Sequence, residues 1–278
     1  MTKHLCAIAG ILLVTPAIAG DLHFISWNVE SGGADPEVIA KQLGELPRAD
    51  IYALQEVDGK DIDTYGHAIQ QSHGESFQFS PSMTGGSDRL LVAYDTSKLT
   101  LFEWREVFHF NDVEISNWQH RSPLVCLFKD RATGQKFYFV TVHLERGDEE
   151  RRNSQARGLT EWADDVDVPV IAVGVFNLDF DIQTQQGNEA FLALRVGEVW
   201  KWAKPEKLVD STWTDENRDG VDDAPHQCDD FAFYVGWPSG WKVTSEFIVR
   251  PGDFPDNETT SNHRPLIVRV SQNESGRN

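Results

Sequence analysis

The sequence has few cysteines, few basic residues and no apolar run of bilayer-spanning length. Three cysteines in 278 residues are too few for a disulfide scaffold. Lys and Arg number 25 against 44 Asp and Glu, which gives a formal charge of −19. This acidic excess argues against a broad basic surface that holds nucleic acid through counterion release. It leaves open an enzyme that contacts a phosphodiester through a metal ion and a few local Arg and His side chains.

The chain nevertheless has enough apolar material for a large core. Hydrophobic residues make up 40% of it, with 16 Phe and 9 Trp, so disorder, collagen and coiled coil are excluded as descriptions of the whole chain. No internal repeat, low-complexity linker or break in composition divides the sequence. The sequence therefore predicts a single domain over residues 20–278, and we expect a monomer.

Residues 1–19 are predicted to be a signal peptide. Lys3 provides a positive start, residues 5–14 form an apolar run, and Ala17-Ile18-Ala19 has small residues at the spacing that a signal peptidase recognises. The alternative is a short membrane anchor, but the run is shorter than the roughly 20 residues that span a bilayer. No later segment is long enough to span either. We therefore expect export, with cleavage after Ala19, to the periplasm or the medium.

Cleavage would remove Cys6 and leave Cys126 and Cys228. Both lie in apolar, strand-like runs, and nothing in the sequence shows that they meet. Separate buried thiols are the favoured interpretation, and a disulfide is the alternative.

Apolar, β-rich runs alternate with helical and loop segments along the whole chain. Asp35 followed by Pro36 is typical of a helix start. Residues 168–176 are almost continuously apolar, as expected of a strand that is covered on both faces. This mixture predicts layered α/β packing. The predicted strands are 22–28, 51–55, 90–94, 123–128, 137–143, 168–176, 231–235, 241–249 and 266–270, with helices after Asp35 and over 149–165.

Polar residues stand where these strands end. Asn28, Glu56, His143 and Asn177 each follow an apolar run, and His263 precedes the last one. Taken singly, each has an ordinary explanation as a turn cap, a solvated acid or a hydrogen-bonded structural histidine. Ligand sites in layered α/β folds collect at strand ends, so the set of five predicts one site where these residues converge in a cleft.

Six blocks carry a resemblance to a known family. They occur in family order, and the resemblance runs over residues 24–270: SWNVE (26–30), ALQEVD (53–58), TVHLE (141–145), GVFN (174–177), CDDFAF (228–233) and SNHRP (261–265). Together they resemble the endonuclease/exonuclease/phosphatase family, which includes pancreatic-type deoxyribonucleases, abasic-site endonucleases, bacterial sphingomyelinases and inositol-phosphate phosphatases. The resemblance implies an α/β fold, a four-layered sandwich of two face-to-face, mostly antiparallel β-sheets flanked by helices.

The resemblance also implies metal-assisted hydrolysis of a phosphodiester. Glu56 matches the main Mg²⁺ ligand of the family, Asn28 its neutral neighbour, and Asn262 a direct or outer metal position; Mn²⁺ is the alternative ion. Mg²⁺ suits a site with few protein ligands and several waters. His143 and His263 match the two family histidines that contact the phosphate and act as general acid and base.

Four further positions are implied to support these groups. Asp230 matches the carboxylate partner of His263, which fixes the tautomer of the ring and raises its pKa. Asp88 matches the acid that pairs with His143 in the deoxyribonuclease-like branch. Arg121 matches a phosphate contact of that branch, and Asn177 matches the Asn that helps to hold the phosphate.

Two positions depart from the family pattern. Val175 stands where the family has Asp in its GDxN block, and Asn262 stands where it has Asp before the terminal His. Val can neither accept a hydrogen bond nor take a proton, and Asn keeps an oxygen but loses the charge. Two interpretations stay open. Either neighbours such as Asp179 or Asp229 take over and the activity is weakened, or the protein is a non-catalytic member.

A second cation signal lies in residues 215–223. Asp215, Asn217 and Asp219, followed by Gly220, fit the first half of a calcium loop. The twelfth position is His226 instead of the bidentate Glu. The alternatives are therefore a Ca²⁺ site and a solvated acidic loop.

The sequence as a whole predicts an exported, metal-dependent phosphodiester hydrolase of nuclease-like type. A nucleic acid is the expected substrate. The alternatives are a phospholipid or small phosphate-ester hydrolase and a catalytically dead binding or scaffold protein.

Overall fold

The computed structural model describes residues 21–110, 113–116, 121–215, 217–255 and 259–272. The predicted signal peptide lies outside this part of the chain. Within it, no helix is both long and apolar enough to cross a membrane.

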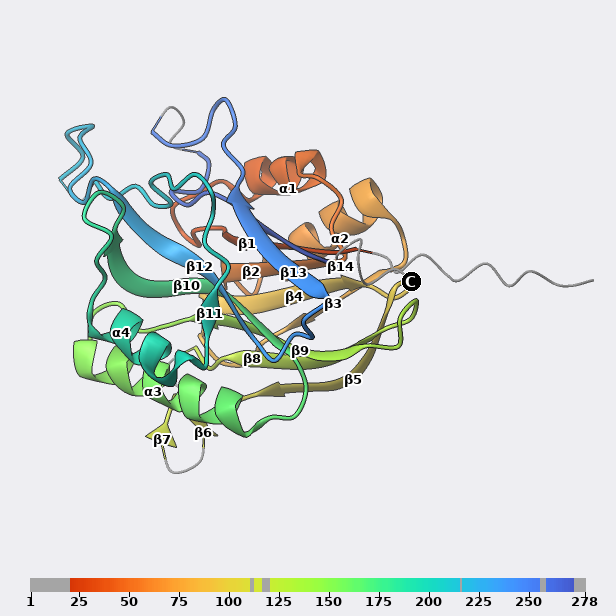
Figure 1. The fold of residues 1–278 in the computed structure, drawn as a ribbon. Coiled ribbons are helices and arrows are strands. Elements are labelled where there is room, and N and C mark those ends of the chain that lie inside the picture. Colours follow the sequence, from red (N-terminus) through yellow and green to blue (C-terminus); the bar gives the residue numbers. More distant parts are fainter. Residues whose placement is uncertain (1–20, 111–112, 117–120, 216, 256–258, 273–278) are drawn as a thin grey trace, which may run out of the picture.

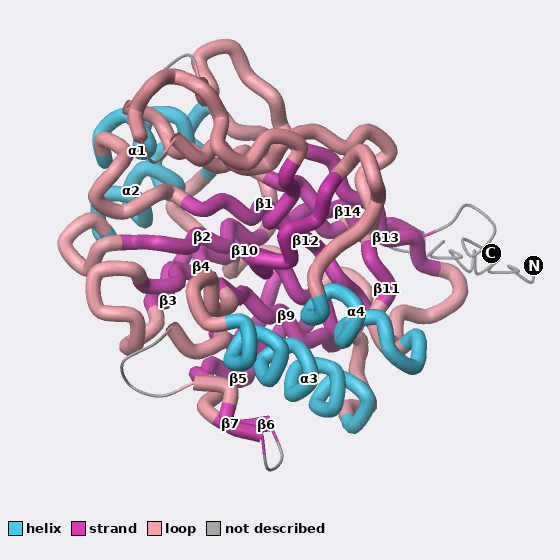
Figure 2. The backbone as a smooth tube through the Cα atoms, turned by 90° about the vertical axis from the view of Figure 1, so that its left-hand side faces the viewer, coloured by secondary structure: helices cyan, strands magenta, loops and turns pink. Residues whose placement is uncertain are grey.

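Two six-stranded sheets lie face to face between two pairs of helices (Figures 1 and 2). The first sheet has the spatial order β13 (Trp241–Phe247), β14 (Leu266–Gln272), β1 (Leu22–Asn28), β2 (Ile51–Val57), β4 (Arg89–Asp95) and β3 (Phe77–Pro81). The second has the order β11 (Lys201–Trp202), β12 (Gln227–Val235), β10 (Val170–Asp181), β9 (Lys136–His143), β8 (Leu124–Asp130) and β5 (Leu99–Glu106). The short strands β6 (His109–Phe110) and β7 (Val113–Glu114) pair separately.

Helices form the outer layers. The helices α1 (Pro36–Glu45) and α2 (Ile62–His73) lie on the first sheet, and α3 (Glu149–Asp165) and α4 (Glu189–Arg195) on the second, followed by a 3₁₀ turn at Val196–Glu198. In the described sheets β1 with β2 and β9 with β10 are parallel, and the other neighbours are antiparallel. The predicted four-layered, mostly antiparallel sandwich is confirmed.

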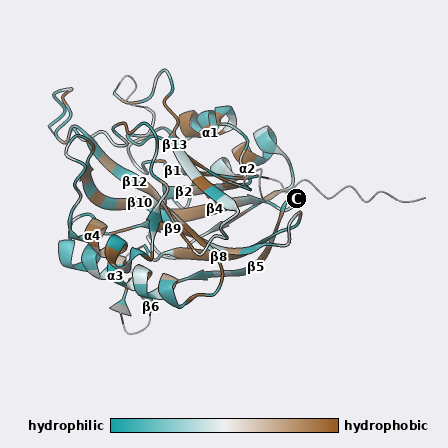
Figure 3. Ribbon diagram, in the orientation of Figure 1, coloured by the Kyte–Doolittle hydropathy of each residue, from teal (hydrophilic) through white to brown (hydrophobic). Residues whose placement is uncertain are grey.

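Strand alternation places apolar side chains on both faces of the central strands. Phe24 of β1 belongs to the core between the sheets, where its ring lies 5.7 Å from Phe137 and 5.3 Å from Phe139 of β9. Its neighbour Ile25 packs on the other side, in the core beneath α1 and α2. A strand buried on both faces needs apolar residues at successive positions, and brown stretches accordingly run along β2, β4 and β8 in Figure 3.

The predicted elements agree with the structure where patterns were strong. The bounds of β1 and α3 are as predicted, and Asp35 caps α1 by accepting the N–H of Glu37 at 2.9 Å. The sequence did not predict α2, β3, β5, α4 or β11. Cys126 on β8 and Cys228 on β12 are both free and buried, so the interpretation as separate thiols is confirmed.

The largest difference is in β10. The prediction ended this strand at Phe176, but it continues to Asp181. Its register with β12 shifts between Val175 and Phe180, so that Asn177 lies on a bulge. A bulge bends a strand and redirects its side chains, and this one lies at the candidate site.

Candidate functional site

Asn28 and Glu56 lie side by side because β1 and β2 are parallel and both end here. Asn28 is the register partner of Gln55, the residue before Glu56. The Nδ2 of Asn28 donates to Oε1 of Glu56 at 3.0 Å, while its Oδ1 accepts the N–H of Glu30 at 2.9 Å. This second bond fixes which way the amide points. Asn28 therefore acts on Glu56 as a hydrogen-bond donor.

His143 ends β9 and faces Glu56 from the second sheet. Its Nδ1 lies 3.5 Å from Oε1 of Glu56, and among the described residues it has no hydrogen-bond partner. The side chain is only 4% exposed. Burial, together with the positive charges of Arg121, His263 and Arg146, holds the pKa of His143 well below its ordinary value. The ring is therefore neutral at neutral pH.

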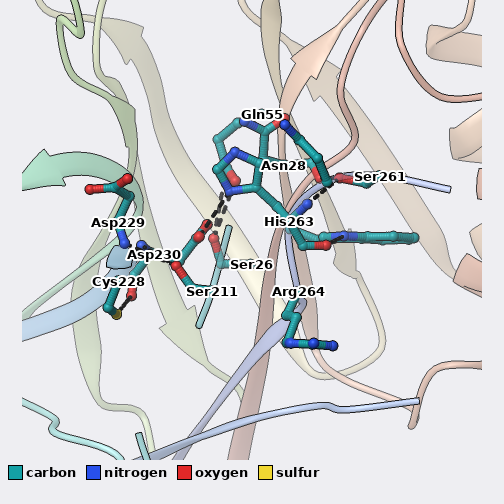
Figure 4. Close-up of polar contacts among 12 residues, drawn as sticks. Ser26, Asn28, Gln55, Ser211, Cys228, Asp229, Asp230, Ser261, His263 and Arg264 are labelled. Carbon is teal, nitrogen blue, oxygen red and sulfur yellow. Dashed lines mark hydrogen bonds and ion pairs between the residues drawn. The ribbon is translucent and has the colours of Figure 1, made fainter. Parts of the chain in front are cut away.

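The pKa of His263 is shifted in the opposite direction. Its Nδ1 lies 2.9 Å from Oδ2 of Asp230, as the resemblance implied (Figure 4). Burial alone would lower the pKa of His263, but the charge and hydrogen bond of Asp230, with a contribution from Glu56, raise it above the ordinary value. The backbone is also held, since Trp27 donates its Nε1–H to the carbonyl of His263 at 2.9 Å.

The predicted partnership of Asp88 with His143 is wrong. Asp88 instead accepts the hydroxyl of Ser31 and lies 3.4 Å from the Nη1 of Arg121, and no hydrogen bond joins it to His143 in the described structure. The guanidinium is the stronger partner because it carries a permanent charge, whereas His143 is neutral. Asp88 thus anchors Arg121, and the role of Arg121 toward a phosphate stays a prediction.

Asn177 and Val175 lie beside the end of β9 that carries His143. The Nδ2 of Asn177 donates to the carbonyl of Leu144 at 2.7 Å, directly after His143. Val175 is the register partner of His143 on one side and of Asp230 on the other. A methyl-bearing side chain therefore occupies the strand position between the two polar groups.

Asp179 and Asp229 do not fill this gap. The Oδ1 of Asp229 accepts the backbone N–H of Asp179 at 3.1 Å. The Oδ2 of Asp179 in turn accepts the Nδ2–H of Asn188 at 2.8 Å and lies 3.5 Å from the Nη2 of Arg152. In Figure 4 the carboxylate of Asp229 points away from His263, on the opposite side from that of Asp230. The hypothesis that either residue replaces the acid absent at position 175 finds no support in this geometry.

Asn262 is held by its amide but leaves its oxygen free. Its Nδ2 donates to the carbonyl of Trp213 at 3.1 Å, while Oδ1 is buried and has no hydrogen-bond partner among the described residues. Its backbone N–H donates to Oε2 of Glu30 at 2.7 Å.

Glu30 is the residue that the sequence analysis did not single out. Its backbone is left-handed, with φ of 52°, and its carboxylate folds over Gly33, where a Cβ would lie 2.2 Å from Oε1. Burial and the nearby charge of Glu56 raise its pKa, whereas the N–H of Asn262 and His263 lower it, and the net direction is upward. Its position in the SWNVE block, two residues after Asn28, was the available signal.

These residues fit a hard divalent cation. Among the described residues no group of three or more His, Cys, Asp or Glu side chains is arranged around a common point. Mg²⁺, however, is bound by one or two carboxylates and keeps most of its waters. The carboxylates of Glu30 and Glu56 and the unpartnered oxygen of Asn262 supply such a set of oxygen donors.

The acidic loop has a separate geometry. Asp215 accepts the N–H groups of Asp219 and Gly220 at 3.0 and 2.9 Å, and Asn217 accepts that of Asp219 at 2.9 Å. These bonds fold the loop around its own side-chain oxygens. The Ca²⁺ interpretation stays a prediction.

The fold is a four-layered α/β sandwich, and the comparisons with known proteins agree on it. No protein-family model matches the sequence, and the curated proteins contain no match either. Solved structures, in contrast, match over nearly the whole chain. An endonuclease/exonuclease/phosphatase from Bacteroides vulgatus has a TM-score of 0.67 at 20% identity, covering 91% of this chain and 100% of that one.

Two further structures show the range of proteins with this fold. TDP2 from D. rerio, solved with a single-strand DNA product, has a TM-score of 0.68 at 19% identity, covering 91% of this chain and 99% of that one. A mannosyl-6-phosphatase from Bacteroides thetaiotaomicron has a TM-score of 0.63 at 19% identity, covering 90% and 99%. The chain thus has the fold of the endonuclease/exonuclease/phosphatase proteins, as its six blocks predicted.

Proposed function

We propose that this protein is an exported, metal-dependent hydrolase of phosphodiester bonds. One observation carries the proposal: His143 and His263, which reach the surroundings of Glu56 from the two halves of the sandwich, have their pKa values pushed in opposite directions. Titratable groups whose surroundings push their pKa values apart are the signature of a paired acid and base. The unpartnered oxygen of Asn262 and the carboxylates of Glu30 and Glu56 add the donors that a hard cation takes.

The residues have complementary tasks in this reaction. Asp230 accepts the Nδ1–H of His263 and raises the pKa of the ring, which favours the imidazolium form whose Nε2–H can be donated to the oxygen that leaves phosphorus. Neutral His143 has a lone pair with which to accept a proton from the attacking water. A bound Mg²⁺ or Mn²⁺ would polarise a phosphate oxygen. Asn28 keeps Glu56 oriented, and Arg121, braced by Asp88, offers a positive charge to the substrate.

Turnover of bis-(p-nitrophenyl) phosphate tests the proposal. We expect hydrolysis with Mg²⁺ or Mn²⁺, its loss with a chelator, and a decrease of about 10² to 10⁴-fold in His263→Gln and in Glu56→Gln. The matched controls are His67→Gln on α2 and Glu37→Gln on α1, both exposed and outside the site. Hydrolysis that survives both site substitutions would contradict the proposal, and so would a purified protein without any metal-dependent turnover.

The substrate is proposed to be a nucleic acid, with a phospholipid or small phosphate ester as the alternative. Parallel assays on DNA, sphingomyelin and sugar phosphates separate these classes. A catalytically dead binding protein is the second candidate function, because Val175 occupies the position between His143 and Asp230 where the family pattern has an acid. A folded, metal-binding protein that is inactive on every substrate would favour it.

Two further parts of the proposal concern the N-terminus and the acidic loop. Export predicts a mature chain that begins at Gly20, which mass spectrometry of the protein recovered outside the cytoplasm would test. Calcium binding predicts a rise in melting temperature at millimolar Ca²⁺ that Asp215→Ala combined with Asp219→Ala removes. An unshifted melting curve would leave the loop as a solvated acidic segment.

A further inference from the structure

Ser211 lies where β12 and the segment carrying His263 meet, and its side chain is fully buried. Its Oγ accepts two successive backbone N–H groups, from Asp229 at 2.9 Å and from Asp230 at 3.3 Å. Successive N–H groups that converge on one acceptor mark a break in the regular strand. The break is at the level where β10 bulges away from β12, so these two N–H groups need an acceptor from elsewhere.

The backbone of Ser211 also contacts the segment that carries His263, the hydrogen-bond partner of Asp230. The carbonyl of Ser211 accepts the N–H of Arg264 at 2.9 Å, and its own N–H donates to the carbonyl of Gln227 at 3.0 Å. The next residue, Thr212, forms a β-bridge with His263. One residue thus binds the strand that carries Asp230 and the segment that carries His263, and Figure 4 shows it next to both.

We propose that Ser211 is a positioning residue that sets the distance between Asp230 and His263. The inference rests on the proposed hydrolase function, in which this couple handles a proton. Asp230 is on the second sheet and His263 precedes the last strand of the first, so neither sheet by itself fixes their separation. The hydroxyl of Ser211 is the acceptor that holds the backbone of Asp230, while the carbonyl of Ser211 holds the residue after His263. Without the hydroxyl, two buried N–H groups lose their acceptor and the strand shifts to find another.

The test compares Ser211→Ala, which removes the hydroxyl, with Ser211→Thr, which keeps it. In Ser211→Ala we expect kcat for bis-(p-nitrophenyl) phosphate to fall by about 10 to 100-fold, with KM changed by less than about threefold, because misplaced reacting groups impair the chemical step more than ground-state binding. Ser211→Thr is expected to restore most of the loss. Ser245→Ala, another buried serine but on β13, is the matched control and is expected to leave both constants unchanged.

A spectroscopic readout separates this inference from the proposed function. The proton between Nδ1 of His263 and Asp230 is expected to give a low-field NMR resonance, assigned by its absence in His263→Gln. Ser211→Ala should displace or broaden this resonance and Ser211→Thr should retain it, whether or not the protein turns over any substrate. Should Ser211→Ala fail to fold, Ser211→Cys, whose sulfur is a weak acceptor, replaces it under the same criteria. A resonance at the wild-type position in Ser211→Ala, or in Ser211→Cys where that variant replaces it, overturns the inference. If the wild-type protein is inactive but Ser211→Ala displaces the resonance, only the proposed function is overturned.

Discussion

At the scale of single residues, Glu30 bears on the charge missing at position 262. Asn262 has lost the carboxylate of the family pattern, yet its backbone N–H binds the carboxylate of Glu30 at 2.7 Å. A negative charge is thus still present next to Asn262, delivered from the end of β1. This arrangement depends on Gly33, since any Cβ there would collide with the Glu30 side chain.

Glu30→Gln is therefore expected to weaken Mg²⁺ binding by about tenfold or more, as losses of supporting carboxylates typically do. Gly33→Ala should weaken it in the same direction without removing charge, because the methyl group displaces the Glu30 carboxylate. Isothermal titration and the rise in melting temperature with Mg²⁺ measure both. Glu37→Gln controls for the loss of one negative charge. Unaltered Mg²⁺ affinity in both site variants would show that Glu30 is not part of the cation site.

Asp229 predicts a pH dependence of stability. Burial, with the charges of Asp230 and Asp179, raises its pKa from 3.8 to about 6. The folded protein therefore binds this proton more tightly than the unfolded chain does. The tighter binding of this proton adds about 3 kcal/mol to the free energy of unfolding below about pH 4. This contribution is lost as the pH rises to about 6 and beyond.

Asp229→Asn keeps the oxygen that accepts the N–H of Asp179 but removes the ionisation. At pH 7 the variant should be more stable than the wild type by about 1 to 3 kcal/mol, and at pH 4 the two should be nearly equal. Urea denaturation at both pH values provides the measurement. Asp63→Asn, on the exposed side of α2, is the control. A stability difference that is the same at pH 4 and pH 7 would contradict the assigned burial of the charge.

At the scale of elements, the sequence predicted those whose signals are local. The cap of α1 by Asp35 and the buried central strands follow from short-range patterns, and both agree with the structure. The bulge of β10 could not be predicted because it is set by pairing with β12, more than 40 residues later in the chain. For the same reason the partner of Asp88 was predicted wrongly: Arg121 reaches it only through the packing of two loops. The six blocks contain the residues that the structure brings together around Glu56, but Glu30, which ends one of these blocks, was not singled out, and Ser211 lies outside all six.

The β10 position of Val175 allows the missing acid to be restored. An Asp there would lie between His143 and Asp230 and would be buried without a counter-charge, so Val175→Asp alone should lower the melting temperature in the absence of metal. Added Mg²⁺ should recover part of this loss. The double variant Val175→Asp plus Asn262→Asp should have a phosphodiester turnover well above that of either single variant, because both carboxylates act on one transition state.

The four proteins of this cycle, each with and without Mg²⁺, distinguish an altered enzyme from a dead one. A double variant that folds and binds metal but stays inactive would favour the binding-protein alternative. A wild-type protein that is already fast, and that restoration leaves unchanged, would show that Val175 and Asn262 are not losses of function.

At the scale of the whole molecule, the charge of −19 constrains the substrate. A polyanion such as duplex DNA has the same sign of charge as this protein, so the long-range electrostatic interaction between them is repulsive. The small ester bis-(p-nitrophenyl) phosphate carries a single negative charge and is repelled much less. Salt screens charges beyond about 10 Å at 0.1 M. Screening therefore helps a polyanion to reach this protein, which is the reverse of its effect on basic nucleic-acid-binding proteins.

We accordingly expect kcat/KM on a DNA duplex to rise by about two- to fivefold between about 20 and 200 mM KCl at constant Mg²⁺, since long-range repulsion slows association and salt removes it. For bis-(p-nitrophenyl) phosphate the same change of salt should have a much smaller effect, which makes it the internal control. Mg²⁺ must stay saturating in both assays, because the proposed cation site contains carboxylates whose affinity for Mg²⁺ also falls with salt. If kcat/KM on DNA instead falls steeply with salt, the substrate is held by a local row of basic residues, and the net charge of the chain does not govern its encounter with DNA.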